Sequence, residues 1–372
     1  MAQSKLPATV DSIVDFFEKD FADIRCQASW DFSGKQLYLG NHRVNKICLA
    51  LDPIKSVINQ AIDRGCELLV THHPLFFRPS QGLDSANTRD SIVISAIKGD
   101  LNILSYHTNL DMAADGLNAH LIRLLSAQCT GVMGEEGGVP HSQLQLYVPE
   151  SHETQLIDAM AAAGAGQIRN YRRCAFSAKG VSTFTPMEGA NPYIGTIDQA
   201  VYVNEVCIDM VVPDHKIDAV VAVIRSKHPY EAPAYYVSPV MSPNPHYKGR
   251  IGSFQNAVPF ENFIERIKKA LNIENVLVNM PSYRREVEKF AVITGSGASE
   301  WRECLNAGID LLVTGDMKHH DAVDAREAGV YIVDAGHFAT EKIYMTYLAK
   351  VLESKFDVKC VEADEEPSIQ IL

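Results

Sequence analysis

Several features that mark large protein classes are scarce in this chain of 372 residues. Lysine and arginine number 34 against 46 aspartates and glutamates, which gives a formal net charge of −12. A protein that coats nucleic acid needs a concentrated basic face, so nucleic-acid binding is not indicated. An anionic small-molecule substrate stays possible, because a metal ion or a few local lysines can supply positive charge.

Long apolar runs and paired cysteines are also missing. No stretch is long enough to cross a bilayer, and the N-terminal residues lack the charged-then-apolar pattern of a signal peptide. The eight cysteines are scattered, without a CxxC pair or zinc-finger spacing. We therefore expect reduced thiols in a cytoplasmic protein with no membrane segment.

Strand-like and helix-like segments alternate in the first third of the chain. Apolar runs at 46–51, 68–71 and 101–106 have the character of strands, and helical spacing lies between them at 54–61 and 92–97. Such alternation predicts an α/β fold with a parallel or mixed sheet and flanking helices.

The same order returns near the C-terminus. The segment Arg64–Thr71 shares Gly, an acid and Leu-Leu-Val-Thr, in register, with Ala307–Thr314, and strand-like runs at 290–294 and 330–333 flank the second copy. This pattern predicts a duplicated α/β unit. Chance similarity is the alternative, because strands rich in valine and leucine resemble one another.

The middle of the chain has a different character. Glycines cluster after Thr130, and the segments 144–148 and 200–203 alternate as half-buried antiparallel strands do. Helical patterns cover 153–163 and 214–227. We predict an inserted ferredoxin-like α+β domain, which divides the chain into residues 1–129, 130–247 and 248–372.

Four segments that carry histidines follow predicted strands. Open α/β sheets place their ligands at the carboxyl ends of strands, so the four segments are expected to share one site. They are Thr71-His72-His73-Pro74, His107-Thr108-Asn109-Leu110-Asp111, Gly315-Asp316-Met317-Lys318-His319-His320-Asp321 and Asp334-Ala335-Gly336-His337-Phe338-Ala339-Thr340-Glu341.

His337 and Glu341 are four residues apart at the start of an amphipathic helix. This spacing puts both side chains on one helical face, where they can grip a metal ion. The start of a helix opposes a cation, so carboxylates such as Glu341 and Asp111 are needed to offset the dipole. Taken alone, the pair is also compatible with an ordinary helix start and a solvated glutamate.

His72 and His73 pose a geometric question, because adjacent side chains on a strand point to opposite faces. If the strand continues to His73, the two imidazoles diverge and bind two neighbouring ions. Otherwise one ring turns inward where Pro74 bends the chain. Two ions about 3.5–4 Å apart, bridged by a carboxylate, would activate a water molecule for hydrolysis. Imidazole and carboxylate ligands suit Zn, Fe or Mn better than Ca.

Taken together, the four segments resemble the motifs of the Nif-three-like family, whose bacterial members are commonly labelled GTP cyclohydrolase I type 2 homologues. The resemblance implies two divalent metal ions per subunit with Glu341 as the bridge. It also implies a toroidal homohexamer, a trimer of dimers, whose sites face an internal cavity. The implied metal ligands are His72, His73, Asp111, His337 and Glu341.

Segments elsewhere in the chain also carry the resemblance. His228-Pro229-Tyr230-Glu231-Ala232-Pro233 and Tyr193-Ile194-Gly195 are similar to the PII- and CutA-like module inserted in longer family members. Ser29-Trp30-Asp31 followed by Gly34-Lys35-Gln36 resembles a family pattern in which leucine is usual at the place of Lys35. His228-Pro229-Tyr230-Glu231 could form a ligand site, but we expect this segment to pack within the inserted module, with Tyr235 and Tyr236 at its core or interface.

Other polar groups near the strand ends could assist catalysis. Glu341, His107, His319 and His320 are candidates for acid–base roles, although the last two could also be solvated histidines at a helix start. Asp316 and His107 are candidate partners of metal ligands. For Gly295-Ser296-Gly297 a tight turn is favoured over a phosphate-binding loop.

The sequence therefore predicts a dinuclear metal-dependent hydrolase acting on a small, nucleotide-like substrate. The family label suggests GTP, opened at its imidazole ring to give 7,8-dihydroneopterin triphosphate. The alternative is a metal-binding regulatory or interaction protein without turnover, and metal storage is a third possibility.

Overall fold

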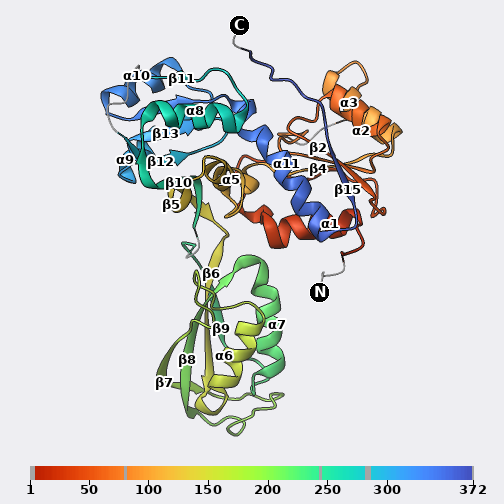
Figure 1. The fold of residues 1–372 in the computed structure, drawn as a ribbon. Coiled ribbons are helices and arrows are strands. Elements are labelled where there is room, and N and C mark those ends of the chain that lie inside the picture. Colours follow the sequence, from red (N-terminus) through yellow and green to blue (C-terminus); the bar gives the residue numbers. More distant parts are fainter. Residues whose placement is uncertain (1–4, 79–81, 243–244, 281–285, 371–372) are drawn as a thin grey trace. The chain divides into compact units, whose positions relative to one another are not determined.

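The computed structural model describes residues 5–78, 82–242, 245–280 and 286–370. The chain forms two compact units (Figure 1). One contains the described residues up to Glu136 and those from His246 onward, and the other is Gly137–Pro245. The outer segments predicted to form a duplicated α/β domain therefore fold together, and the middle segment folds by itself.

The first sheet of the larger unit has five strands in the order β1-β4-β3-β2-β15. Strands β2, β3 and β4 are parallel, and β15 adds a further parallel strand beside β2. Every residue of β3 is buried, as expected for a strand with both faces covered. The bounds are β1 Gly34–Leu37, β2 Lys46–Ala50, β3 Leu68–Thr71, β4 Asn102–Ser105 and β15 Lys359–Glu362.

The second sheet repeats the central arrangement in the order β11-β14-β13-β12-β10-β5. Its strands β12, β13 and β14 are parallel, and β11 is antiparallel to β14 as β1 is to β4. The two Leu-Leu-Val-Thr segments form β3 and β13, the middle strands of the two parallel sets. The bounds are β5 Gln128–Gly138, β10 Pro245–Val258, β11 Leu277–Val278, β12 Val287–Val292, β13 Leu311–Thr314 and β14 Tyr331–Asp334.

Helices connect the parallel strands in both halves. In the first half α2 (Lys55–Asp63) and α3 (Thr88–Lys98) make these connections, and in the second half α9 (Trp301–Asn306) and α10 (His319–Glu327) do so. The remaining helices of this unit are α1 Val10–Asp15, α4 Thr108–Met112, α5 Leu117–Leu124, α8 Phe260–Leu271 and α11 His337–Lys355.

Helix α11 joins the two sheets. It begins directly after β14 of the second sheet, and its residues Tyr344, Leu348 and Leu352 are buried in one apolar core with Ile47 and Leu49 of β2. The chain then enters the first sheet as β15 (Figure 1). Residues at the start of α11 are therefore brought to the carboxyl ends of β2 and β3.

The inserted unit has the element order β6-α6-β7-β8-α7-β9 and an antiparallel sheet ordered β7-β8-β6-β9. This is the ferredoxin-like arrangement predicted from the sequence. The unit begins at Gly137, later than the predicted residue 130, because the residues just after Thr130 belong to β5 in the second sheet of the larger unit. The bounds are β6 His141–Pro149, α6 Glu153–Ala162, β7 Phe176–Phe184, β8 Val201–Pro213, α7 Ile217–Lys227 and β9 Tyr235–Val240.

No helix within the described ranges is both long and apolar enough to span a membrane. All eight cysteines are free thiols.

His120 on α5 gives the larger unit a predicted dependence of stability on pH. Its ring packs against Tyr347 with the centroids 4.7 Å apart, and burial together with the charge of Arg123 lowers the pKa of His120 to about 4. Between pH 4 and 6.5 His120 is therefore protonated in the unfolded chain but not in the folded one. Its contribution to the free energy of unfolding is complete above pH 6.5 and is lost as the pH falls toward 4.

The free energy of unfolding of the wild-type protein should fall between pH 7 and pH 5. In His120→Leu we expect this fall to be about 1 kcal/mol smaller. Denaturant unfolding at the two pH values measures this difference. His319→Leu is the control, because His319 is exposed and should leave the pH dependence unchanged. Equal pH dependence in wild type and His120→Leu would contradict the assignment.

Candidate metal centre

Polar residues from both sheets meet at the carboxyl ends of the parallel strands. In the first sheet Asp52 follows β2, His72 and His73 follow β3, and His107 follows β4. In the second sheet the corresponding positions are Gly295 after β12, Asp316 after β13 and His337 after β14. The site is thus built from the same edge of two related sheets, which is the edge where α/β folds bind ligands.

His72 and His73 approach different oxygens of Glu341. His72 Nε2 lies 3.6 Å from Oε1, and His73 Nε2 lies 3.3 Å from Oε2. Strand β3 ends at Thr71, so the alternation of a pleated strand does not separate the two rings, whose centroids are 5.1 Å apart. The conditional prediction of diverging rings therefore does not apply, and both imidazoles face one carboxylate.

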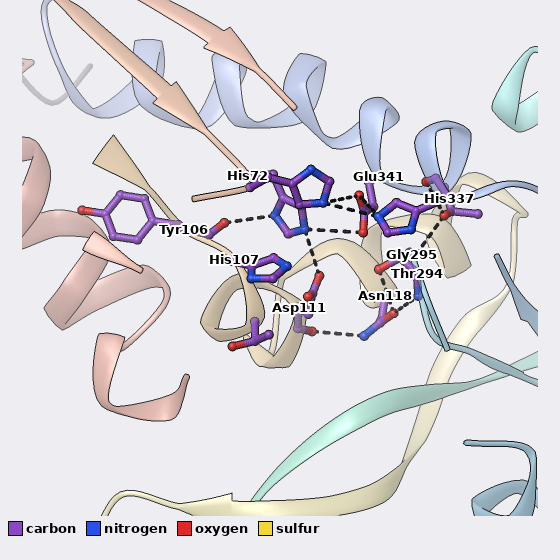
Figure 2. Close-up of polar contacts among 12 residues, drawn as sticks. His72, Tyr106, His107, Asp111, Asn118, Thr294, Gly295, His337 and Glu341 are labelled. Atoms are coloured by element: carbon purple, nitrogen blue, oxygen red, sulfur yellow. Dashed lines mark hydrogen bonds and ion pairs between the residues drawn. The ribbon is translucent and has the colours of Figure 1, made fainter. Parts of the chain in front are cut away.

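His337 completes the group around Glu341. Its Nε2 lies 3.1 Å from Glu341 Oε2 and 3.3 Å from His73 Nε2, and Figure 2 shows His337 and Glu341 pointing toward His72. The i,i+4 spacing on α11 produces this approach, as predicted. His73, His337 and Glu341 thus present three ligand atoms within 4.8 Å of one another.

Asp111 lies on the other side of His72. Its Oδ1 is 3.7 Å from His72 Nε2, and it comes from α4, directly after β4. Burial and the nearby Glu341 carboxylate raise the pKa of Asp111, whereas the neighbouring imidazoles of His72 and His337 lower the pKa of Glu341 against the effect of its burial. Two carboxylates therefore lie in a dry region that favours positive charge.

Three ligand atoms of this group are buried without a hydrogen-bond partner: His72 Nε2, Asp111 Oδ1 and Glu341 Oε2. Buried polar atoms without partners destabilise a fold by about 1–3 kcal/mol each. Cations bound between imidazole nitrogens and carboxylate oxygens would satisfy them, and this donor set suits divalent transition metals. The residues present therefore fit a metal centre.

The far nitrogen of each histidine is held by an oxygen. Nδ1 of His72 donates to the Tyr106 carbonyl oxygen, Nδ1 of His73 to Asp52, and Nδ1 of His337 to Asp316, at 3.0, 2.8 and 2.8 Å. These bonds leave Nε2 of each ring as the atom that faces the cluster. Asp316 was predicted as such a partner and Asp52 was not, although Asp52 also follows a strand.

His107 is placed beside the cluster. The centroid of its ring lies 5.1 Å from that of the His72 ring and 5.4 Å from that of the His73 ring. Its Nδ1 donates to Asp31 Oδ1 at 2.9 Å. Asp31 is buried and also accepts from the backbone and side chain of Thr108. A histidine fixed in this way can hold or pass a proton beside the metal ligands.

The histidine pair at the start of α10 is placed differently. His319 and His320 are exposed, and within the described part of the chain no contact is found between them and the cluster. This agrees with the alternative of solvated helix-start histidines.

A hydrogen-bonded frame ties Asp111 to Glu341. The buried Asn118 donates to the Asp111 carbonyl oxygen and accepts from the amide of Thr294, while the Gly295 amide donates to Thr340 Oγ1 (Figure 2). The Gly297 amide donates to Thr314 Oγ1. The backbone amides of Gly295 and Gly297 thus donate to threonine hydroxyls of the protein. For Gly295-Ser296-Gly297 this favours a tight turn over a phosphate-binding loop.

Gly295 is required by this geometry. A Cβ added there would lie 2.1 Å from Glu341 Oε1, and the residue has φ +66°. We expect Gly295→Ala to displace Glu341 and to lower metal affinity by more than about tenfold, besides a strain of about 1–2 kcal/mol. Gly308→Ala is a matched control, because Gly308 has φ +69° and open space around its Cβ. Equal metal content in both variants would contradict the role of Gly295.

Fold and site together define a class: a mixed α/β protein with several mixed sheets and a histidine–carboxylate cluster able to hold metal. A family model described as Duf34/NIF3 (NGG1p interacting factor 3) matches residues 8–368. The chain therefore belongs to the DUF34/NIF3 family.

Individual relatives cover almost the whole chain. The "GTP cyclohydrolase 1 type 2 homolog" of Halalkalibacterium halodurans is 33% identical over 94% of this chain and 95% of its own length. The protein of the same name from Bacillus subtilis is 33% identical over 92% and 91%. A crystal structure of a Bacillus cereus protein related to NIF3 aligns with a TM-score of 0.81 and 30% identity, covering 99% of this chain and all of the other.

Proposed function

We propose that the protein is a dinuclear metal-dependent hydrolase acting on a nucleotide-like substrate. One observation carries the proposal: three imidazole nitrogens approach the two oxygens of the buried Glu341, and the Asp111 carboxylate lies beside one of these nitrogens, His72 Nε2. Two divalent ions, with Zn, Fe or Mn preferred by these ligands, would supply a polarised water molecule for hydrolysis. His72, His73, Asp111, His337 and Glu341 would hold them, with Glu341 between the two.

His107 is the proposed acid–base group. Asp31 fixes its Nδ1, so Nε2 is free to take or give a proton on the side of the cluster. His319 and His320 are not included in this role, because they are exposed at the start of α10. Glu341 is assigned to metal binding rather than to proton transfer.

Aromatic side chains beside His107 support a substrate with a flat ring. Trp30 and Phe77 are 58% and 50% exposed, and their rings lie 5.6 and 6.1 Å from that of His107. Exposed aromatic faces stack well on planar bases. The names of the homologues support GTP as the base-containing substrate. Water would open its imidazole ring, the carbon between the two ring nitrogens would leave as formate, and closure of a new ring with rearranged ribose carbons would give 7,8-dihydroneopterin triphosphate.

Metal-loaded protein incubated with GTP and a panel of other nucleotides tests the proposal. We expect turnover of one member, a lower kcat in Asp31→Asn, and a higher KM with little change of kcat in Trp30→Ala. Tyr171→Ala, which removes an exposed ring of the inserted unit, should change neither constant. If metal-loaded protein and His72→Ala leave the whole panel equally untouched, the hydrolase is excluded and metal binding without turnover, as in a regulatory protein, takes its place.

We also propose a homohexamer, on the resemblance to the family, and a cytoplasmic location, supported by the eight free thiols. Light scattering should give six times the chain mass of 41.1 kDa. A PII- or CutA-like role of the inserted unit is proposed on its ferredoxin-like strand order.

A further inference from the structure

The inserted unit contains a cavity that the metal centre does not use. Its volume is about 470 Å³, within the range of small-molecule sites. Aromatic rings make up much of the wall, and two carboxylates accompany them. The lining residues used here are Tyr147, Phe184, Tyr193, Tyr230, Tyr236 and Glu205.

The cavity lies on the sheet face that the helices do not cover. On β8 the residues Val206, Ile208 and Met210 enter the core beneath α6 and α7. Side chains alternate along a strand, so Glu205 projects from the opposite face. Tyr147 on β6 projects the same way, because Leu146 and Val148 belong to the core.

Glu205 is the unusual group of this cavity. The residue is 4% exposed, and its Oε1 has no hydrogen-bond partner. A buried carboxylate that no cation neutralises is costly. The hydroxyl of Tyr230 lies beside Glu205, and the described lining residues include a second carboxylate, Glu231, but no lysine or arginine. A ligand with positive charge would compensate Glu205, whereas a phosphate group would meet two negative charges.

The rings around Glu205 suit an organic cation. Tyr230 lies 6.1 Å from Tyr193 and 5.9 Å from Phe184, and Tyr147 lies 6.2 Å from Tyr236, measured between ring centroids. Burial and the neighbouring Glu205 raise the pKa of Tyr230, so its hydroxyl stays protonated. Aromatic faces attract alkylated ammonium groups, which carry a diffuse positive charge and an apolar surface.

His228 supports the shape of the cavity without offering a ligand atom. Its Nε2 bonds to the Tyr147 carbonyl oxygen and its Nδ1 accepts from the Tyr230 amide, at 2.9 and 3.0 Å. His228 is therefore a packing residue, whereas Tyr230 and Glu231 of the same segment line the cavity.

We propose that this cavity is a binding site for a small organic cation bearing an alkylated ammonium group. Rings from three strands and two loops form a cage, and Glu205 at its base neutralises the charge. The site is independent of the metal centre and of the proposed hydrolysis.

Calorimetric titration of the full-length, metal-loaded protein with choline and with 3,3-dimethyl-1-butanol tests the proposal. The two probes have nearly the same shape and differ in charge. We expect choline to bind at least about tenfold more tightly than the neutral alcohol. Absence of choline binding, or equal binding of both probes, overturns the proposal. Displacement of bound choline by ATP would place an anionic nucleotide in the cavity and overturns it as well.

Variants locate the binding within the cage. Glu205→Gln and Tyr193→Leu should each weaken choline binding by about tenfold, while Tyr193→Phe keeps the ring and the affinity. Tyr193 is 56% exposed, so its replacement does not endanger folding. Glu153→Gln on α6, beyond the other face of the sheet, is the matched control. Choline binding that survives Glu205→Gln and Tyr193→Leu unchanged would place the cation elsewhere and overturn the assignment.

Discussion

Glu341→Gln is expected to empty both proposed metal positions and to abolish the proposed hydrolysis. The side chain is 3% exposed, and its two oxygens face different histidines, so no other carboxylate can take both contacts. A glutamine of the same size keeps one carbonyl oxygen but loses the negative charge that a bridging ligand requires. We expect metal affinity to fall by more than about a hundredfold, beyond the loss typical of a supporting residue.

Metal analysis and thermal unfolding measure this effect together. Bound metal stabilises the folded state, so a chelator should lower the wild-type Tm by about 5–10 °C and leave the Tm of Glu341→Gln unchanged. Glu265→Gln on α8 removes an exposed carboxylate of the same kind and should behave as wild type. A full complement of metal in Glu341→Gln would exclude Glu341 as the bridge.

The sequence was sufficient to predict where the site lies. Strand ends could be recognised from short buried runs such as Leu68–Thr71, and the repeated Leu-Leu-Val-Thr indicated that a second sheet would supply the same edge. The i,i+4 spacing of His337 and Glu341 then followed from helix geometry. Local patterns were enough because each depends on only one element.

Contacts between distant segments could not be predicted in this way. Asp52 accepts a hydrogen bond from His73, which is 21 positions away in the sequence, and Asp31 accepts one from His107, which is 76 positions away. Asn118 joins a loop 176 positions away, although it looks like any polar residue of a helix. Which carboxylate or amide meets which imidazole is decided by how two sheets pack, and sequence periodicity carries no information on that packing.

The path of α11 explains why the site needs both halves. The helix supplies His337 and Glu341 at its start, while its later residues pack on β2 and lead into β15 of the first sheet. Loss of packing between α11 and the first sheet would therefore separate Glu341 from His72 and His73. Metal binding and the docking of this helix should stabilise each other.

The two ions are expected to be separable by mutation. His72 lies beside Glu341 Oε1 and has Asp111 as a neighbour, whereas His73 and His337 lie beside Oε2. His72→Ala should therefore weaken the first ion and leave the second bound, and His337→Ala should do the reverse. Both variants should lose the proposed hydrolysis, because the polarisation of water that it requires would be supplied by the two ions together.

Metal titration followed by mass spectrometry of the native protein counts the ions in each variant. Asp111→Asn should share the behaviour of His72→Ala, and His73→Ala that of His337→Ala, since each pair holds one ion. Combining two changes within a pair should add little, while combining changes from different pairs should remove both ions. If each single substitution removes both ions to the same extent, the cluster binds them as one unit. The assignment of the two Glu341 oxygens to two different ions would then be wrong.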